Sequence, residues 1–103
     1  MSSEEQPNMY GTVAMCSVLP ENAERLMALA AAEDGLGITG YLGTEVLVAE
    51  NHPNTMLMVV RFSDRESYVA NADSPGQDAR YGEFRALMES DPVWYDGEWV
   101  TSR

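Results

Sequence analysis

The chain has 103 residues, 45% of them hydrophobic, and a formal net charge of -11, which indicates one globular domain with a single core. The acidic balance disfavours nucleic acid and anionic membranes as partners, and the absence of Lys excludes Schiff-base chemistry and a P-loop lysine. No run of about 18 apolar residues occurs and the acidic start lacks the pattern of a secretory signal, so we expect a cytoplasmic protein without a membrane span.

The first third of the chain predicts a tail, a strand and a helix. Met1–Asn8 has no apolar anchor and is expected to be a mobile tail in front of one domain over residues 9–103. Met9–Leu19 is apolar and rich in β-forming residues, which predicts the first strand. After Pro20, apolar residues recur at helical spacing over Glu21–Glu33, which predicts a helix that packs on the sheet.

The middle of the chain predicts two strands joined by a short loop. Tyr41–Glu50 is expected to be the second strand, and residues 51–54 form the connection. Met56–Val60 is continuously apolar, so its side chains are apolar on both faces of the third strand.

Two helix starts follow the third strand. Ser63 stands three residues before Glu66, a spacing typical of a capping box at a helix N-terminus. Ser74 and Gln77 repeat that spacing, and Pro75 falls at the first position of the second helix, where its missing N–H costs nothing.

The last segment predicts an amphipathic helix and a final strand. Tyr81, Phe84 and Met88 fall at i, i+3 and i+7, which places them on the inner face of the helix. The arms on either side of Asp96-Gly97 are too short for a hairpin, so the final strand is predicted at Glu98–Ser102.

These elements predict an α+β fold of the ferredoxin-like split βαβ type, in the order β-α-β-β-α-α-β, with a four-stranded antiparallel sheet. The helices cover one face of that sheet. Because the third strand is apolar at both alternating sets of positions (Met56, Met58 and Val60 against Leu57 and Val59), a second copy of the chain is expected to cover the other face, which predicts a homodimer.

The segment from Arg61 to Tyr68 (RFSDRESY), the Ser74-Pro75 corner and the Gly40-Tyr41 start of the second strand resemble the antibiotic biosynthesis monooxygenase family. The resemblance implies a dimeric α/β barrel built from ferredoxin-like protomers. It does not fix the reaction, because the family includes cofactor-independent quinone-forming oxygenases, haem-degrading oxygenases, isomerases and proteins of no known activity.

Two branches of the family can be compared with this chain. In the quinone-forming oxygenases a Trp ends the third strand, an Asn lies four residues before it and a Tyr six residues after it. The positions here are Phe62, Met58 and Tyr68, so the resemblance retains only the tyrosine.

In the haem-degrading branch the corresponding groups are an Asn on the first strand, a Trp at the helix corner and a His ligand on the next helix. The positions here are Ala14 or Met15, Asn71 and Tyr81, and none of the three family residues is present.

Tyr68 is therefore the candidate catalytic residue, because a phenol in a dry pocket can donate a hydrogen bond to a substrate anion. The alternative is a tyrosine that packs its ring and sends its hydroxyl to water. Asn71 and Tyr81 are candidate substrate-binding residues; Asn71 can instead end a helix in the left-handed conformation. Phe62 and Met58 are candidate walls of the pocket, or ordinary core.

The remaining candidates come from less specific patterns. Trp94, Tyr95 and Trp99 are expected to form an aromatic lid, with Trp94 as a substrate-binding residue, or to serve as core or dimer contacts. Arg61 is expected to pair with an acid, although it can also orient an anionic ligand.

The lone histidine and cysteine are expected to be inert. His52 lies in a predicted turn and is expected to be solvated. Cys16 lies in an apolar strand and is expected to be a buried thiol. No spacing typical of a metal site occurs, so no metal and no cofactor are expected.

Two functions from different classes are consistent with these residues. The first is a cofactor-independent monooxygenase acting on a small aromatic or polyketide-type molecule. The second is a dimer that binds a small apolar or aromatic molecule without transforming it, or that has only a structural role. A haem-binding or haem-degrading protein is a third interpretation.

Overall fold

Residues 8–100 are described by the computed structural model, and they form four strands, three α-helices and one short 3-10 helix. In chain order the elements are β1 (Tyr10–Ser17), α1 (Pro20–Ala32), η2 (Glu33–Gly35), β2 (Tyr41–Val48), β3 (Thr55–Phe62), α2 (Arg65–Ala72), α3 (Pro75–Arg85) and β4 (Val93–Glu98). The order confirms the predicted ferredoxin-like arrangement. The predicted N-terminal tail, apart from Asn8, lies outside the described residues.

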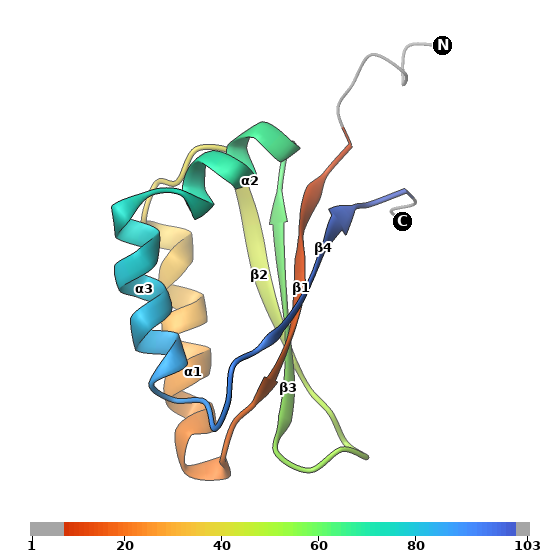
Figure 1. Cartoon of the computed structure of the whole chain (residues 1–103), viewed down its shortest axis with the longest axis vertical. Helices are drawn as coiled ribbons and strands as arrows, with labels where there is room; N and C mark the ends of the chain where they lie inside the picture. The colour runs from red at the N-terminus through yellow and green to blue at the C-terminus, as the bar shows by residue number, and fades with distance from the viewer. Residues whose placement is uncertain (1–7, 101–103) are drawn as a thin grey trace.

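The sheet has the strand order β2-β3-β1-β4, and every neighbouring pair is antiparallel. Helices α1 and α3 lie on one face of this sheet, and within residues 8–100 no helix lies on the other face (Figure 1). The fold therefore has two layers. In the described part of the chain, none of the helices has the length and apolar character needed to cross a membrane.

Two caps show how the local sequence begins the helices of the second half. Ser74 caps α3 as predicted, because its side chain accepts a hydrogen bond from the Gln77 backbone N–H at 3.2 Å. The predicted cap at Ser63 is wrong: Asp64 caps α2, and its Oδ1 accepts from the Ser67 backbone N–H at 2.8 Å. The hydrogen bonds from Ser67 hold the pKa of Asp64 below its usual value, so the cap stays charged.

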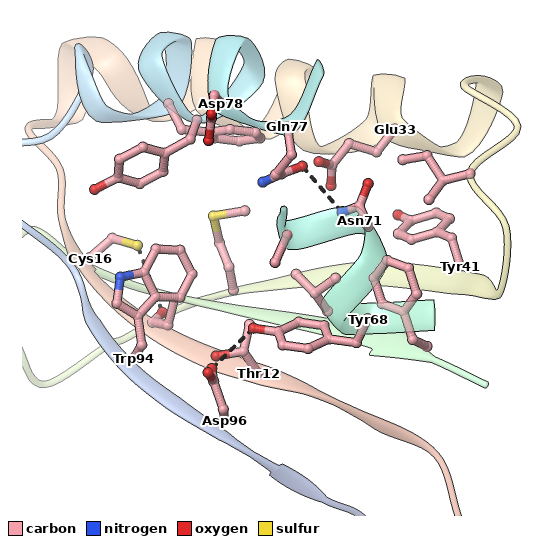
Figure 2. Close-up of a pocket in the computed structure, with 18 of the residues that line it drawn as sticks. Thr12, Cys16, Glu33, Tyr41, Tyr68, Asn71, Gln77, Asp78, Trp94 and Asp96 are labelled. Atoms are coloured by element: carbon pink, nitrogen blue, oxygen red, sulfur yellow. Dashed lines mark hydrogen bonds between the residues drawn. The ribbon is translucent and has the colours of Figure 1, made fainter. Parts of the chain in front are cut away.

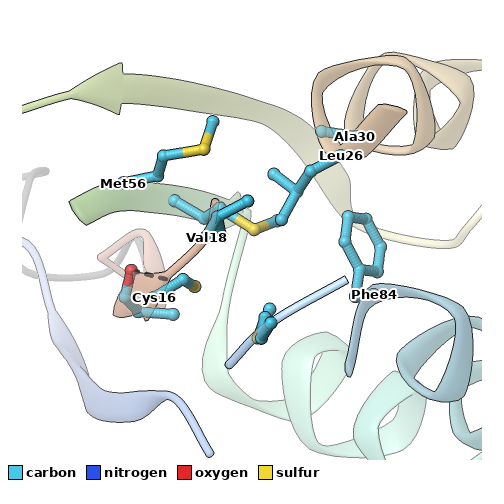
Figure 3. Close-up of a cluster of buried hydrophobic side chains, with 9 residues drawn as sticks. Cys16, Val18, Leu26, Ala30, Met56 and Phe84 are labelled. Atoms are coloured by element: carbon cyan, nitrogen blue, oxygen red, sulfur yellow. Dashed lines mark hydrogen bonds between the residues drawn. The ribbon is translucent and has the colours of Figure 1, made fainter. Parts of the chain in front are cut away.

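The core lies between the sheet and helices α1 and α3 (Figure 3). Leu26 and Ala30 are one helical turn apart on α1, and both are buried against the sheet. Met56 from β3 and Phe84 from α3 are also buried in this cluster. Apolar residues at helical spacing on the helices and at alternate positions on the strands therefore meet in one layer.

The predicted final strand is misplaced. The observed strand β4 covers Val93–Glu98, Trp99 and Val100 follow it outside the sheet, and residues 101 and 102 lie outside the described residues. The prediction assumed that a strand here needs a hairpin partner. Instead β4 pairs with β1, which is distant in sequence and supplies the backbone hydrogen bonds.

The face of the sheet without helices is apolar, and we call it the open face. The register places Leu47, Leu57, Met15 and Val93 in one row across the four strands. Of these, Leu47 is 54% exposed, Val93 43% and Met15 41%. Val13, Val59 and Tyr95 form the next row together with Glu45 of β2, so the open face is apolar along the first row and carries one exposed acid in the second. Contiguous exposed apolar surface of this kind marks an interaction surface.

Candidate functional site

A cavity of about 450 Å³ lies between the helix layer and the sheet (Figure 2). This volume falls within the range typical of small-molecule sites, roughly 300–1,000 Å³. All six residues predicted to be catalytic or substrate-binding line the cavity: Tyr68, Asn71, Tyr81, Phe62, Met58 and Trp94. The fold thus brings these side chains together, while the role of each stays a prediction.

Phe62 and Met58 form part of the apolar wall on β3. They are 1% and 7% exposed, and two-residue alternation along the strand points both toward the helices. The Phe62 ring meets the rings of Tyr41 and Tyr68 edge to face, with centroids 5.7 and 5.6 Å apart. This aromatic cluster fixes the position of Tyr68.

Tyr81 and Trp94 lie together at another part of the cavity wall, with ring centroids 5.9 Å apart. The predicted three-residue aromatic lid is wrong in part. Alternation along β4 sends Tyr95 to the open face, and Trp99 lines a separate hollow there with Tyr95. Only Trp94 of the three therefore lines the cavity.

Tyr68 donates a hydrogen bond from its hydroxyl to Asp96 Oδ1 at 3.1 Å. Burial, followed by the negative charge and hydrogen bond of Asp96, raises the pKa of Tyr68 to about 12. The nearby Thr12 hydroxyl opposes this rise, although its geometry does not meet that of a hydrogen bond. The phenol therefore keeps its proton at neutral pH, and its oxygen can accept a further hydrogen bond.

The Thr12 hydroxyl is a polar group that sequence reasoning missed. Thr12 is 3% exposed and lines the cavity beside Tyr68 and Asp96 (Figure 2). Its Oγ1 is buried without a hydrogen-bond partner among residues 8–100. Leaving such a group unpaired costs about 1–3 kcal/mol. The available signal was alternation with Ala14 and Cys16 along β1, which places Thr12 on the helix side.

Asp96 was also missed, because Asp96-Gly97 was considered as a turn. It lies opposite Thr12 in the register between β1 and β4, and it lines the cavity. Only the strand pairing reveals this position, since nothing in the sequence near Asp96 points to β1.

Asn71 belongs to a polar cluster with Gln77 and Arg80. Arg80 Nη2 donates to Asn71 Oδ1 at 3.1 Å and to Gln77 Oε1 at 3.0 Å, while Asn71 Nδ2 donates to Gln77 Oε1 at 3.3 Å. Asn71 lies within α2, and the described non-glycine residue with positive φ is Asn54. The alternative of a left-handed helix end at Asn71 is therefore wrong, and its amide is held at the cavity wall.

Glu33 is a buried acid in the cavity wall that sequence reasoning also missed. It is 8% exposed, and its Oε1 accepts a hydrogen bond from Thr44 Oγ1 at 3.1 Å. The Tyr41 and Thr44 hydroxyl oxygens are 2.6 Å apart, which extends the chain of hydrogen bonds. Burial raises the pKa of Glu33, and the Thr44 hydrogen bond and the Arg80 charge act against that rise.

The other sequence candidates lie away from this chemistry or are inert. His52 is exposed in the β2–β3 loop and does not line the cavity. Cys16 is 1% exposed in the cavity wall, and burial raises the pKa of its thiol. Arg61 Nε lies 3.8 Å from Glu45 Oε1, which fits the structural ion pair. Among residues 8–100, no group of three or more His, Cys, Asp or Glu side chains is placed to hold a metal ion.

Solved structures with the same fold cover nearly the whole chain. A candidate antibiotic biosynthesis monooxygenase from Caulobacter crescentus has a TM-score of 0.74 at 16% identity, covering 97% of this chain and 98% of that one. A conserved protein from Methanosarcina mazei Go1 has a TM-score of 0.73 at 16% identity, covering 95% and 98%. SnoaB, a cofactor-independent oxygenase from Streptomyces nogalater, has a TM-score of 0.69 at 17% identity, covering 93% and 95%. At these identities the likeness shows the fold alone.

The family itself is shown by the sequence. No curated protein matches the chain. The family model of the antibiotic biosynthesis monooxygenases matches residues 9–86, which spans β1 to the end of α3 and includes Tyr68. This match confirms the resemblance carried by Arg61–Tyr68, Ser74-Pro75 and Gly40-Tyr41, and the chain belongs to the antibiotic biosynthesis monooxygenase family.

Proposed function

We propose that the chain is a cofactor-independent monooxygenase that oxidises a small aromatic or polyketide-type molecule in the cavity. The observation that carries this proposal is the hydrogen bond from Tyr68 to Asp96 at 3.1 Å, set in the wall of an aromatic cavity of about 450 Å³. Family membership and the shared fold with the cofactor-independent oxygenase SnoaB support it.

Asp96 is the proposed base and Tyr68 the proposed hydrogen-bond donor. A substrate hydroxyl or an acidic ring C–H loses its proton to the Asp96 carboxylate, which lies beside the substrate space. When Asp96 takes that proton, the Tyr68 hydroxyl is released to donate to the anionic oxygen of the substrate. Because the pKa of Tyr68 is about 12, the phenol has a proton to donate throughout the neutral range.

The substrate anion is the reductant and molecular oxygen is the oxidant. A ring CH₂ group becomes C=O: one oxygen atom bonds to the carbon, and the other leaves as water with the two hydrogens. The carbon loses four electrons and the oxygen molecule gains four, so no further reductant is needed. The buried apolar side chains of Phe62 and Met58 would keep bulk water away from one side of the reactive anion.

A binding protein without catalysis is the second candidate. Phe62 and Met58 stand where the quinone-forming branch carries Trp and Asn, and both are nearly fully buried. A cavity whose wall is apolar at those two positions can hold an aromatic molecule by burial alone.

The open face supports a homodimer in either case. Its row of Leu47, Leu57, Met15 and Val93 is apolar and partly exposed, and a second copy would bury it as the dimeric members of the family do. The cavity lies on the opposite side of the sheet, so dimer formation through the open face would leave the cavity free to bind a ligand.

Oxygen uptake with a panel of phenols and anthrones tests the catalytic proposal. We expect uptake without added cofactor, and a loss of about 100-fold in kcat for Tyr68→Phe, because that variant removes one donor to the substrate anion. Tyr95→Phe is the matched control, since Tyr95 lies on the open face and does not line the cavity. Saturable binding of the same compounds with no uptake would favour the binding protein.

A further inference from the structure

Polar groups line the cavity both on the side of the sheet and on the side of the helix layer (Figure 2). We call Thr12, Tyr68 and Asp96 the phenol end, and Glu33 the carboxyl end. The phenol end is built from α2, β1 and β4, whereas Glu33 of the carboxyl end belongs to η2 in the helix layer. A ligand that fills the cavity would therefore meet polar groups at both of its ends.

The carboxyl end is built to accept hydrogen bonds. Thr44 donates to Glu33 Oε1, and among the described residues no second donor reaches this carboxyl group. With the carboxyl ionised, the single hydroxyl proton of Thr44 points to Glu33, so Tyr41 must donate to Thr44. Oε2 is thus left to accept a hydrogen bond from a molecule in the cavity.

The charges that line the cavity all have one sign. Within the described part of the chain, its charged lining residues are Glu33, Asp78 and Asp96. Arg80 influences Glu33 through its charge, but its guanidinium is held by Asn71 and Gln77 and does not line the cavity. An anionic ligand would therefore meet like charges at both ends, without a cation to offset them.

We propose that Glu33 determines ligand specificity, selecting neutral or cationic aromatic molecules with hydrogen-bond donors at both ends and rejecting carboxylates. One donor reaches the acceptors of Tyr68 and Asp96, and the other reaches Glu33 Oε2. This inference rests on the proposed function only in that the cavity takes a small aromatic molecule.

The test is calorimetric binding of a matched naphthalene series to the wild-type protein. The series has hydroxyls at both ends, one hydroxyl alone, one hydroxyl with an opposite carboxylate, and one hydroxyl with an opposite aminomethyl group. We expect the dihydroxy and aminomethyl compounds to bind about tenfold more tightly than the single hydroxyl, because each gains a hydrogen bond to a charged group. The carboxylate should bind more weakly than the single hydroxyl.

Glu33→Gln removes the charge and keeps the shape. We expect it to weaken binding of the dihydroxy and aminomethyl compounds about tenfold and to tighten binding of the carboxylate. Glu24→Gln is the control, because Glu24 is exposed on α1 and gives the same change in net charge. Circular dichroism establishes that both variants fold, and the wild-type series tests the proposal even if Glu33→Gln does not fold.

Three results would overturn the inference: equal affinity for carboxylate and dihydroxy compounds, unchanged discrimination in Glu33→Gln, or no binding by any member of the series. The proposed oxygenase activity fails separately. If the protein binds the series selectively but takes up no oxygen, the oxygenase activity is rejected and the inference about Glu33 stands. If oxygen uptake is seen and Glu33→Gln changes neither uptake nor ligand selectivity, the activity stands and the inference is rejected.

Discussion

Tyr68 on α2 and Asp96 on β4 are joined by a hydrogen bond of 3.1 Å between groups 28 positions apart in the chain. The bond is possible because β4 pairs with β1 in a register that places Asp96 opposite Thr12. It links the residue that the family resemblance selects to an acid that only the folded chain brings near. The proposed chemistry depends on this pair.

The ionisation of Tyr68 is a direct measure of its surroundings. Burial and Asp96 raise its pKa to about 12, against an ordinary value of about 10. The unfolded chain should therefore ionise first, and the folded state should lose the stability contributed by this group as pH rises from about 10 to 12. The difference in ultraviolet absorbance between wild type and Tyr68→Phe follows this titration.

Asp96→Asn should lower the pKa of Tyr68 while leaving it above the ordinary value, because the charge is removed and the burial remains. Asp73→Asn, at an exposed acid, is the control and should leave the titration unchanged. The absorbance values are used only at pH values where near-ultraviolet circular dichroism shows native packing. The same midpoint in wild type and Asp96→Asn would contradict an electrostatic role for Asp96.

Gly40→Ala should destabilise the fold more than Gly37→Ala. Both glycines have positive φ, 78° and 67°, where an alanine costs about 1–2 kcal/mol. A Cβ at Gly40 would also overlap the Ser67 side chain on α2, whereas a Cβ at Gly37 would meet open space. We expect Gly40→Ala to lower the free energy of unfolding by about 1 kcal/mol more than Gly37→Ala, measured by urea denaturation.

Equal losses for the two glycine variants would show that the Gly40–Ser67 approach relaxes at no cost. The double variant Gly40→Ala/Ser67→Gly separates the conformational cost at Gly40 from the cost of the overlap with the Ser67 side chain. Removing the Ser67 side chain should recover the excess loss and leave the conformational cost at Gly40.

Leu57→Glu should convert the proposed dimer to monomers. Leu57 lies between Met15 and Leu47 in the row across the open face, so the substitution places a charge inside the buried interface. Sedimentation velocity at micromolar concentration measures the change. Leu36→Glu is the control, because Leu36 is 48% exposed beside η2 and away from the sheet. If the wild-type protein sediments as a monomer and still binds its ligand and takes up oxygen, the proposed dimer is rejected.

Glu33 should make folding stability fall as pH rises. Burial raises its pKa in the folded state, so the folded chain holds this proton more tightly than the unfolded chain. The contribution of Glu33 is therefore complete below the ordinary pKa of about 4.3, and it is lost as pH rises through the higher folded value. Thr44 and Arg80 reduce this effect, and Asp34 adds to it.

Urea denaturation of wild type and Glu33→Gln between about pH 4 and pH 7 isolates that contribution. We expect the stability of the variant relative to wild type to increase with pH. Glu24→Gln, at an exposed acid on α1, is the control for the change in net charge. A constant difference between wild type and Glu33→Gln would mean that the carboxyl binds its proton equally in the folded and unfolded states, which contradicts a raised pKa in the folded chain.

The helix starts show what local pattern can and cannot predict. Ser74 and Pro75 specify the start of α3 because cap and first turn lie within a few residues of each other. At the start of α2 the pattern predicted Ser63 as the cap, and the backbone places the next residue, Asp64, there instead. Local chemistry thus locates a helix start to within one residue when two capping side chains adjoin.

The amino-acid sequence by itself determined the order of elements, the apolar faces of strands and helices, and the family segment that contains Tyr68. Each of these follows from periodicity or from neighbours in the chain, which short-range physics controls. Tertiary structure alone decided the pairing of β4 with β1, and with it the approach of Asp96 to Tyr68 and the unpaired state of Thr12. It also buried Glu33 against Thr44. These polar contacts join segments far apart in sequence, so no local pattern encodes them.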